Sequence, residues 1–91
     1  MNNKEARQLI KAELAVYDRK PFVELVTLID QDFHYEKQGP SGASYQIEIL
    51  ILWDSTPNGA IRVLGSIDDG GWRAFFPLTD SVIVTQSKTI D

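Results

Sequence analysis

Hydrophobic positions recur with helical spacing over the first third of the chain. Residues 4–18 are rich in good helix formers. One broad stripe along this segment is apolar except for a single acid, and it comprises Ala6, Leu9, Ile10, Glu13, Leu14, Val16 and Tyr17. Asp18 and Pro21 break the pattern, but Pro21 fits the first turn of a second helix that Asp18 can cap. Apolar residues spaced i, i+3, i+4 and i+7 from Phe22 then predict that second helix over about residues 21–30.

The remainder of the chain alternates between apolar and polar positions, which is typical of strands with one wet face. Strands are predicted over about residues 32–37, 45–54, 60–68, 72–78 and 81–85. The connections between them are too short for crossovers, so the sheet should be antiparallel. We therefore expect a single α+β domain over residues 1–91, with two N-terminal helices packed on one face of a four- or five-stranded antiparallel meander.

Parity predicts how the two longest strands pair. When Trp53 is placed opposite Ile61, apolar positions face one another along both strands, whereas a shift of one residue pairs apolar with polar positions. The predicted apolar pairs are Trp53–Ile61, Ile51–Val63, Ile49–Gly65 and Ile47–Ile67.

The stretch DDGG, residues 68–71, follows this pair of strands. Placing Ile67 opposite Trp72 makes Asp69 and Gly70 the central residues of a two-residue type I′ turn, for which Asp-Gly is a preferred pair. A calcium loop needs oxygen ligands at regular offsets, and this stretch offers only two adjacent carboxylates. The sequence therefore predicts a turn here, and not a metal or substrate site.

The same register predicts a mixed second face of the sheet. Its apolar members are Leu50, Leu52, Leu64 and Phe75, and its polar members include Glu48 and Arg73, which can form a cross-strand charge pair. If nothing in the chain covers the apolar members, they form a binding surface. Three ways of covering these apolar members remain open. They are a second copy of the chain, a foreign partner, and internal cover by residues 81–84 or by the loop over residues 38–44. We expect a homodimer.

Candidate chemistry centres on His34, the only histidine in the chain. It lies between Asp32 and Glu36 on one strand face, where a carboxylate could orient it as a general base. The simpler interpretation is an outward polar stripe, because no nucleophile or oxyanion donor can be named beside it. Asp30, Asp32, His34 and Glu36 alternate along one side of the strand, and a straight strand spaces successive members of such a series ~7 Å apart. These four side chains therefore cannot all converge on one ion. We therefore expect no metal site and no cofactor.

Composition narrows the class of function. The chain has a formal net charge of −4, which repels phosphate backbones, so we expect no nucleic-acid partner. The longest apolar run, residues 49–53, is too short for a membrane helix, and the first residues lack the apolar core of a signal peptide. There is no cysteine, so disulfides and thiolate sites are absent. These features together favour a cytoplasmic protein.

The segment YDRKPFVELVTLIDQDFHYE, residues 17–36, resembles the opening of nuclear-transport-factor-2-like domains, including the polyketide-cyclase-like subgroup. The resemblance covers about residues 4–37. It implies a curved antiparallel sheet around a conical pocket, frequent dimerisation, and Asp32 and His34 near the pocket mouth, but it assigns them no catalytic role. The chain is shorter than that family and lacks its inserted helix. Residues 65–84 are also similar to small bacterial proteins of unknown function, which implies no activity.

These observations predict a non-catalytic domain that binds a protein or a small ligand as a homodimer. One alternative is an immunity- or inhibitor-type acidic protein that neutralises a basic partner and is released by salt. Another is a small pocket enzyme of the cyclase or isomerase kind that uses His34 and Asp32. That enzyme requires a deep cavity around the histidine or around an acid of raised pKa.

Overall fold

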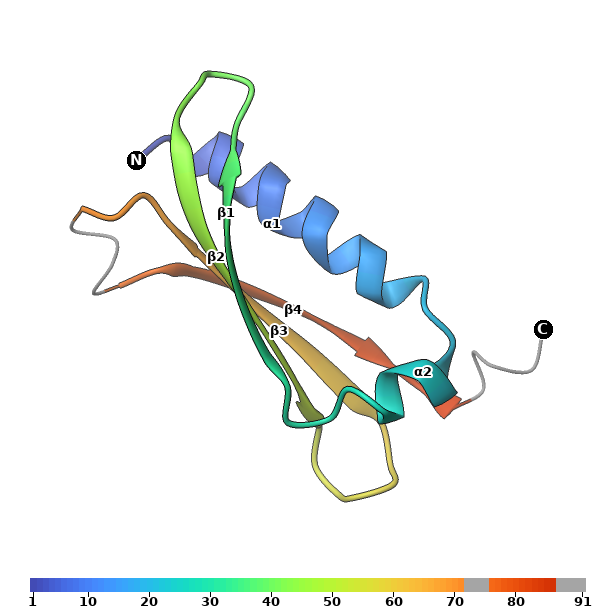
Figure 1. Ribbon diagram of the computed structural model, residues 1–91. Coiled ribbons are helices and arrows are strands. Elements are labelled where there is room, and N and C mark those ends of the chain that lie inside the picture. Colours follow the sequence, from blue (N-terminus) through green and yellow to red (C-terminus); the bar gives the residue numbers. More distant parts are fainter. Residues whose placement is uncertain (72–75, 87–91) are drawn as a thin grey trace.

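The fold is one antiparallel sheet with a long helix across one face (Figure 1). A computed structural model of the chain describes residues 1–71 and 76–86. Within those ranges the strands follow one another in the order β1-β2-β3-β4, which confirms the predicted α+β meander. The elements are α1 (Asn3–Asp18), α2 (Phe22–Val26), β1 (Asp32–Gln38), β2 (Ser44–Trp53), β3 (Ile61–Asp68) and β4 (Leu78–Val84).

Helix α1 forms where the apolar stripe predicted it. Asn2 caps its first turn by accepting a hydrogen bond from the Glu5 amide at 3.1 Å. Ala6, Ile10 and Leu14 recur once per turn and are fully buried against the sheet. No helix in the described ranges is both long enough and apolar enough to cross a membrane.

Helix α2 is shorter than predicted, because the chain leaves the helix to join the sheet. The helix ends at Val26, and hydrogen-bonded turns lead to Asp30, whose φ of 67° is left-handed. The Asp30 amide donates to the carbonyl of Ile51 at 2.7 Å, and the Ile51 amide donates to the carbonyl of Gln31 at 3.2 Å. The predicted cap is also wrong: Pro21 precedes α2 without a side-chain cap, and Asp18 is the last residue of α1.

The pairing of β2 with β3 confirms the register that parity predicted. Trp53 lies opposite Ile61, Ile51 opposite Val63, Ile49 opposite Gly65 and Ile47 opposite Ile67. These positions face α1, and most of them are buried. The core is completed by Tyr45, Phe22, Leu25 and Val84.

The predicted partner of β3 is wrong. Parity placed residues 72–78 beside β3, with Ile67 opposite Trp72, but β4 occupies that edge. Ile67 lies opposite Leu78, and Gly65 lies opposite Asp80. Residues 72–75 lie outside the described part of the chain. The parity argument failed because residues 78–84 alternate as well as residues 72–78 do, and alternation does not fix the length of the connecting loop.

The stretch DDGG does form a turn, although not the predicted type. Gly70 has a φ of 84°, but the only other described residues with left-handed φ values are Gly42, Asp30 and Asn58, so Asp69 does not take part in a type I′ turn. Instead the carboxylates of Asp68 and Asp69 accept hydrogen bonds from the amides of Gly70 and Gly71, at 2.8 and 3.1 Å. Such side-chain caps are typical of loops.

Candidate functional site

The face of the sheet opposite α1, here called the outer face, carries every candidate site residue that the structure describes. Alternation along each strand puts these side chains on one side. Neither helix of the described chain packs on this face (Figure 1). Its cross-strand rows are Leu52–Arg62–Ile83, Asp32–Leu50–Leu64–Ser81, His34–Glu48–Ser66–Thr79 and Glu36–Gln46–Asp68.

One half of the outer face, here called the apolar half, consists of Leu50, Leu52, Leu64 and Ile83. The predicted leucines do lie together, since Leu50 is directly opposite Leu64 on the neighbouring strand. All three leucines are half-buried. Ile83 is 43% exposed and was missed, because the wrong partner had been assigned to β3. The alternation of residues 79–84 was the signal that could have found it. Phe75 and Arg73, predicted on this face, lie outside the described residues.

Arg62 lies inside the apolar half, between Leu52 and Ile83 in one cross-strand row. Its Nε and Nη2 donate to Asp54 Oδ1 at 2.9 and 2.8 Å, and its Nη1 donates to Ser81 Oγ at 2.6 Å. A guanidinium held by a carboxylate and a hydroxyl keeps its position, so the apolar half contains a charge at a fixed position.

Neither of the two segments expected to cover the outer face does so. Residues 81–84 belong to β4 and extend the sheet in its own plane. The loop after β1 is tied to α1, because the Ser41 amide and hydroxyl donate to the Glu5 carboxylate at 2.9 and 2.7 Å. Both observations leave the four residues of the apolar half without internal cover from those segments.

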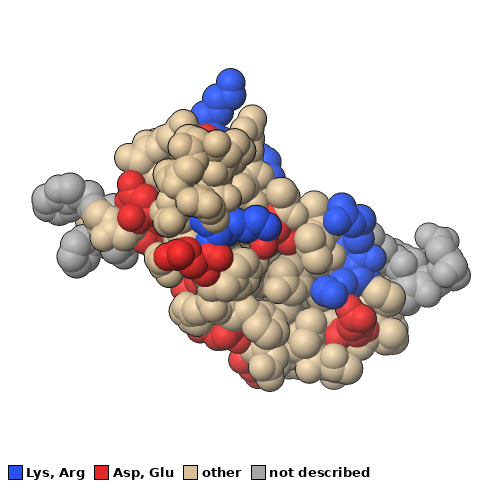
Figure 2. Space-filling view, turned by 45° about the horizontal axis from the view of Figure 1, so that its top comes forward, with Lys and Arg blue, Asp and Glu red and all other residues tan. Residues whose placement is uncertain are grey.

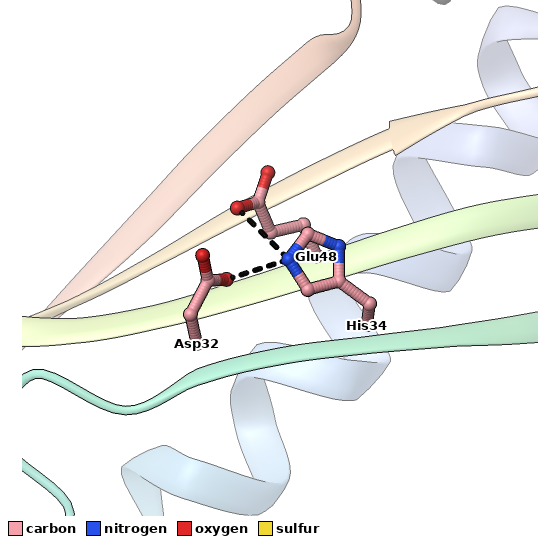
Figure 3. A group of neighbouring side chains, drawn as sticks. All are labelled: Asp32, His34 and Glu48. Carbon is pink, nitrogen blue, oxygen red and sulfur yellow. Dashed lines mark ion pairs between the residues drawn. The ribbon is translucent and has the colours of Figure 1, made fainter.

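The other half of the outer face brings together Asp32, His34 and Glu48, here called the trio (Figure 3). Asp32 and His34 are two residues apart on β1, and Glu48 lies directly opposite His34 on β2. His34 Nε2 lies 3.1 Å from Asp32 Oδ1 and 3.4 Å from Glu48 Oε2. The side chains of His34, Asp32 and Glu48 are 66%, 44% and 41% exposed. Sequence reasoning placed Asp32 and His34 on one strand face and named Glu48 on the mixed face of the sheet, but it did not place Glu48 beside His34, because the pairing of β1 with β2 was not predicted.

Electrostatics in the trio act most strongly on Glu48. Its hydrogen bond with Asp32 raises the pKa of the Glu48 carboxyl, and partial burial and the Asp32 charge raise this pKa further. His34 partly offsets the rise by favouring the charged form. Two carboxylates are therefore held closer together than their charges favour.

A hollow of about 160 Å³ adjoins the trio. It is lined by His34, Gln46, Ile47, Glu48, Ser66, Asp68 and Pro77. Pockets that enclose organic ligands usually measure about 300–1,000 Å³. Within the described residues, the hollow beside the exposed His34 is smaller than the deep cavity that the pocket enzyme would require.

A second hollow, of about 290 Å³, lies where α2 meets the end of the sheet. It is lined by Phe22, Val23, Val26, Trp53, Asn58 and Gln86. The rings of Trp53 and Phe22, both of which line this hollow, lie 6.5 Å apart.

Charged side chains of both signs are interleaved on the molecule. Figure 2 shows basic and acidic groups side by side on one face, with no continuous basic patch. Lys37 pairs with Glu13 at 3.0 Å, and Lys20 pairs with Glu24 at 3.0 Å.

The chain matches no protein-family model, no curated protein and no solved structure. The resemblance to nuclear-transport-factor-2-like domains therefore rests on residues 4–37 alone.

Proposed function

We propose that the protein is a cytoplasmic, non-catalytic binding domain that pairs with a second copy of itself through the apolar half of the outer face. The observation that carries this proposal is the cluster of Leu50, Leu52, Leu64 and Ile83, over which no described helix or strand packs. Leu50 lies directly opposite Leu64, and exposed apolar clusters mark binding surfaces on proteins.

A second copy suits this surface for reasons of size and charge. A chain of 91 residues buries a modest core, so it gains stability by covering further apolar area. Two identical chains related by a two-fold axis through the apolar half would pack leucine on leucine. If that axis runs across the strands, the acidic ends of the two sheets point away from each other, which limits repulsion between chains of net charge −4.

The test is the solution mass of the wild type across concentrations, compared with the Leu64→Glu variant. We expect a wild-type dimer and a folded Leu64→Glu monomer, because a carboxylate buried between two apolar faces is strongly unfavourable. Thr79→Glu is the control and should remain dimeric, because Thr79 lies on the same face in the row of His34 and Glu48. If Leu64→Glu does not fold, Ile83→Glu replaces it, since that side chain is already exposed. A wild type that stays monomeric at about 1 mM, the concentration of very weak association, would overturn the proposal.

A second candidate function is supported by the acidic side chains of the outer face. The part of this face that carries Asp32, Glu36, Glu48 and Asp68 is here called the acidic half. His34 is the only basic group in the cross-strand rows to which these four residues belong. An immunity- or inhibitor-type protein would use such a surface to hold a basic partner. In that case the wild type is a monomer, and its binding to a basic partner weakens as salt is added.

A further inference from the structure

We propose that Asp32, His34 and Glu48 form a binding site for a divalent transition-metal ion of the Zn²⁺ class. The site adjoins the apolar half, since Asp32 lies directly opposite Leu50, and it goes beyond the proposed function. It combines one imidazole nitrogen with two carboxylates from adjacent strands, and their ligand atoms lie within 4.8 Å of one another.

The separations of the two carboxylates from His34 Nε2 are close to those between neighbouring ligands of an ion. Nitrogen and oxygen ligands lie about 2.0–2.2 Å from Zn²⁺, so neighbouring ligands of a tetrahedral ion are separated by roughly 3.3–3.5 Å. The separations from His34 Nε2 are 3.1 Å to Asp32 and 3.4 Å to Glu48. Figure 3 shows both carboxylates directed at His34 Nε2, so an ion would enter by separating the three ligand atoms around it.

The charges of the trio suit a dication. Both carboxylates are directed at the same nitrogen, yet a neutral imidazole offers only one proton there. A dication neutralises both carboxylates, and a neutral imidazole and two carboxylates are ligands that Zn²⁺ accepts.

The donor set also decides the class of metal. Ca²⁺ and Mg²⁺ prefer sites built from oxygen alone, whereas an imidazole suits zinc and its first-row neighbours. Soft ions that require thiolates find none, because the chain has no cysteine. The exposed side of the trio faces solvent, so an ion can enter without any movement of the backbone.

The test is titration of tag-free, chelator-treated protein with Zn²⁺ by calorimetry and with Co²⁺ by visible absorption. Tag-free protein matters because His34 is the only histidine. We expect one ion per chain and ligand-field bands from the Co²⁺ form. Asp32→Asn, His34→Gln and Glu48→Gln should each weaken binding at least about tenfold, the smallest effect usual for disturbing a metal site.

Glu36→Gln is the matched control. Glu36 lies on β1 and on the same face, but it accepts a hydrogen bond from Gln46 at 3.1 Å and is not part of the trio. This variant should bind as the wild type does. Ile83→Glu should also bind one ion per chain, so a failure of the dimer is distinguishable from a failure of the metal site.

Three results would overturn the proposal. The first is the absence of saturable binding, and the second is binding that His34→Gln leaves unchanged. The third is binding that is lost instead in Asp69→Asn, which would place the ion beside the N-terminal amine that lies 3.6 Å from Asp69. Circular dichroism on each variant confirms folding, and the three separate ligand variants keep the test decisive if one of them does not fold.

Discussion

Gly65 is the residue that lets α1 approach the sheet. A Cβ atom at this position would lie 2.8 Å from Ile10 Cδ1 and 3.2 Å from Leu14 Cδ2. Both side chains are fully buried, so neither has free space into which to move. A glycine inside a strand often marks such a close approach of another element.

We expect Gly65→Ala to reduce the free energy of unfolding by about 1–3 kcal/mol, the usual range for overpacking a core. The measurement is chemical denaturation followed by circular dichroism. Gly71→Ala is the control, because the nearest atom to a Cβ there is Asp69 Oδ1 at 3.5 Å, an ordinary contact. Equal stability of Gly65→Ala and wild type would mean that α1 packs less closely than the structure shows.

Glu5 fastens the loop after β1 to the start of α1. Its carboxylate accepts hydrogen bonds from the Ser41 amide and hydroxyl and from the Tyr45 hydroxyl, the last at 2.7 Å. The hydrogen bond from the Ser41 hydroxyl, followed by that from Tyr45, holds the pKa of the Glu5 carboxyl below its ordinary value of 4.5. The hydrogen bond that the Tyr45 hydroxyl donates to Glu5, together with burial, raises the pKa of Tyr45 to about 12.

The lowered pKa of Glu5 predicts an acid-dependent loss of stability. A carboxyl whose pKa is lower in the folded than in the unfolded state stabilises the fold above the unfolded value of 4.5, and this contribution is lost as the pH falls through the folded pKa. Glu5→Gln should therefore be less stable than wild type at pH 7, and this difference should shrink as the pH falls below 4.5. Thermal unfolding at a series of pH values measures it, with Glu36→Gln as control. A difference that stays constant with pH would show that the Glu5 charge does not stabilise the loop.

At the scale of elements, periodicity predicted most of the helices and strands, but it did not predict every pairing between strands. The β2–β3 register followed from parity, because a shift of one residue would turn Ile47, Ile49 and Ile51 away from the core. The partner of β3 did not follow, because two successive segments alternate equally well. The place of Glu48 beside His34 did not follow either, because the pairing of β1 with β2 depends on a loop length that alternation does not encode.

The end of α2 was hidden from the sequence for a related reason. The apolar spacing from Phe22 to Ile29 continues past the helix, because Leu28 and Ile29 pack against the core from hydrogen-bonded turns. Tertiary contacts of the Asp30 amide with Ile51 then outweigh helical propensity. The apolar spacing therefore predicted correctly which of these residues pack against the core, but it predicted the end of α2 incorrectly.

An engineered disulfide tests the pairing of β3 with β4, because the chain has no cysteine of its own. Ser66 lies opposite Thr79 on the outer face. Side chains of directly opposite residues lie within the reach of a disulfide. We expect the Ser66→Cys, Thr79→Cys double variant to form an intramolecular disulfide under mild oxidation, detected by mass spectrometry.

The control for this pairing is Ser66→Cys with Asp80→Cys. Asp80 pairs with Gly65 and its carboxylate contacts Lys11 of α1, so its side chain points to the opposite face. This second pair should stay reduced. If it oxidises as readily as the first, the register shown by the structure is wrong by one residue.

At the scale of the whole molecule, apolar area and charge are unevenly placed. One sheet face is covered by α1, while the outer face divides into an apolar half and an acidic half. Each chain also carries a net charge of −4. Any partner that covers the apolar half therefore approaches a negatively charged molecule. Added salt should strengthen binding to an acidic partner and weaken binding to a basic one.

The dimer should tighten as salt rises, because screening weakens repulsion between two chains of like charge and leaves apolar contact intact. Sedimentation equilibrium between about 0.05 and 0.5 M salt, a range in which the Debye length falls severalfold, measures the dissociation constant. Chelator in the buffer excludes effects of metal ions. The double variant Glu36→Gln, Asp68→Asn removes two charges from the acidic half, so it should dimerise more tightly at low salt and respond less to added salt. A complex with a basic partner would instead weaken along the same titration. A wild-type dimer that weakens with salt would mean that ion pairs between the chains hold it together, and the apolar half would then not be its interface.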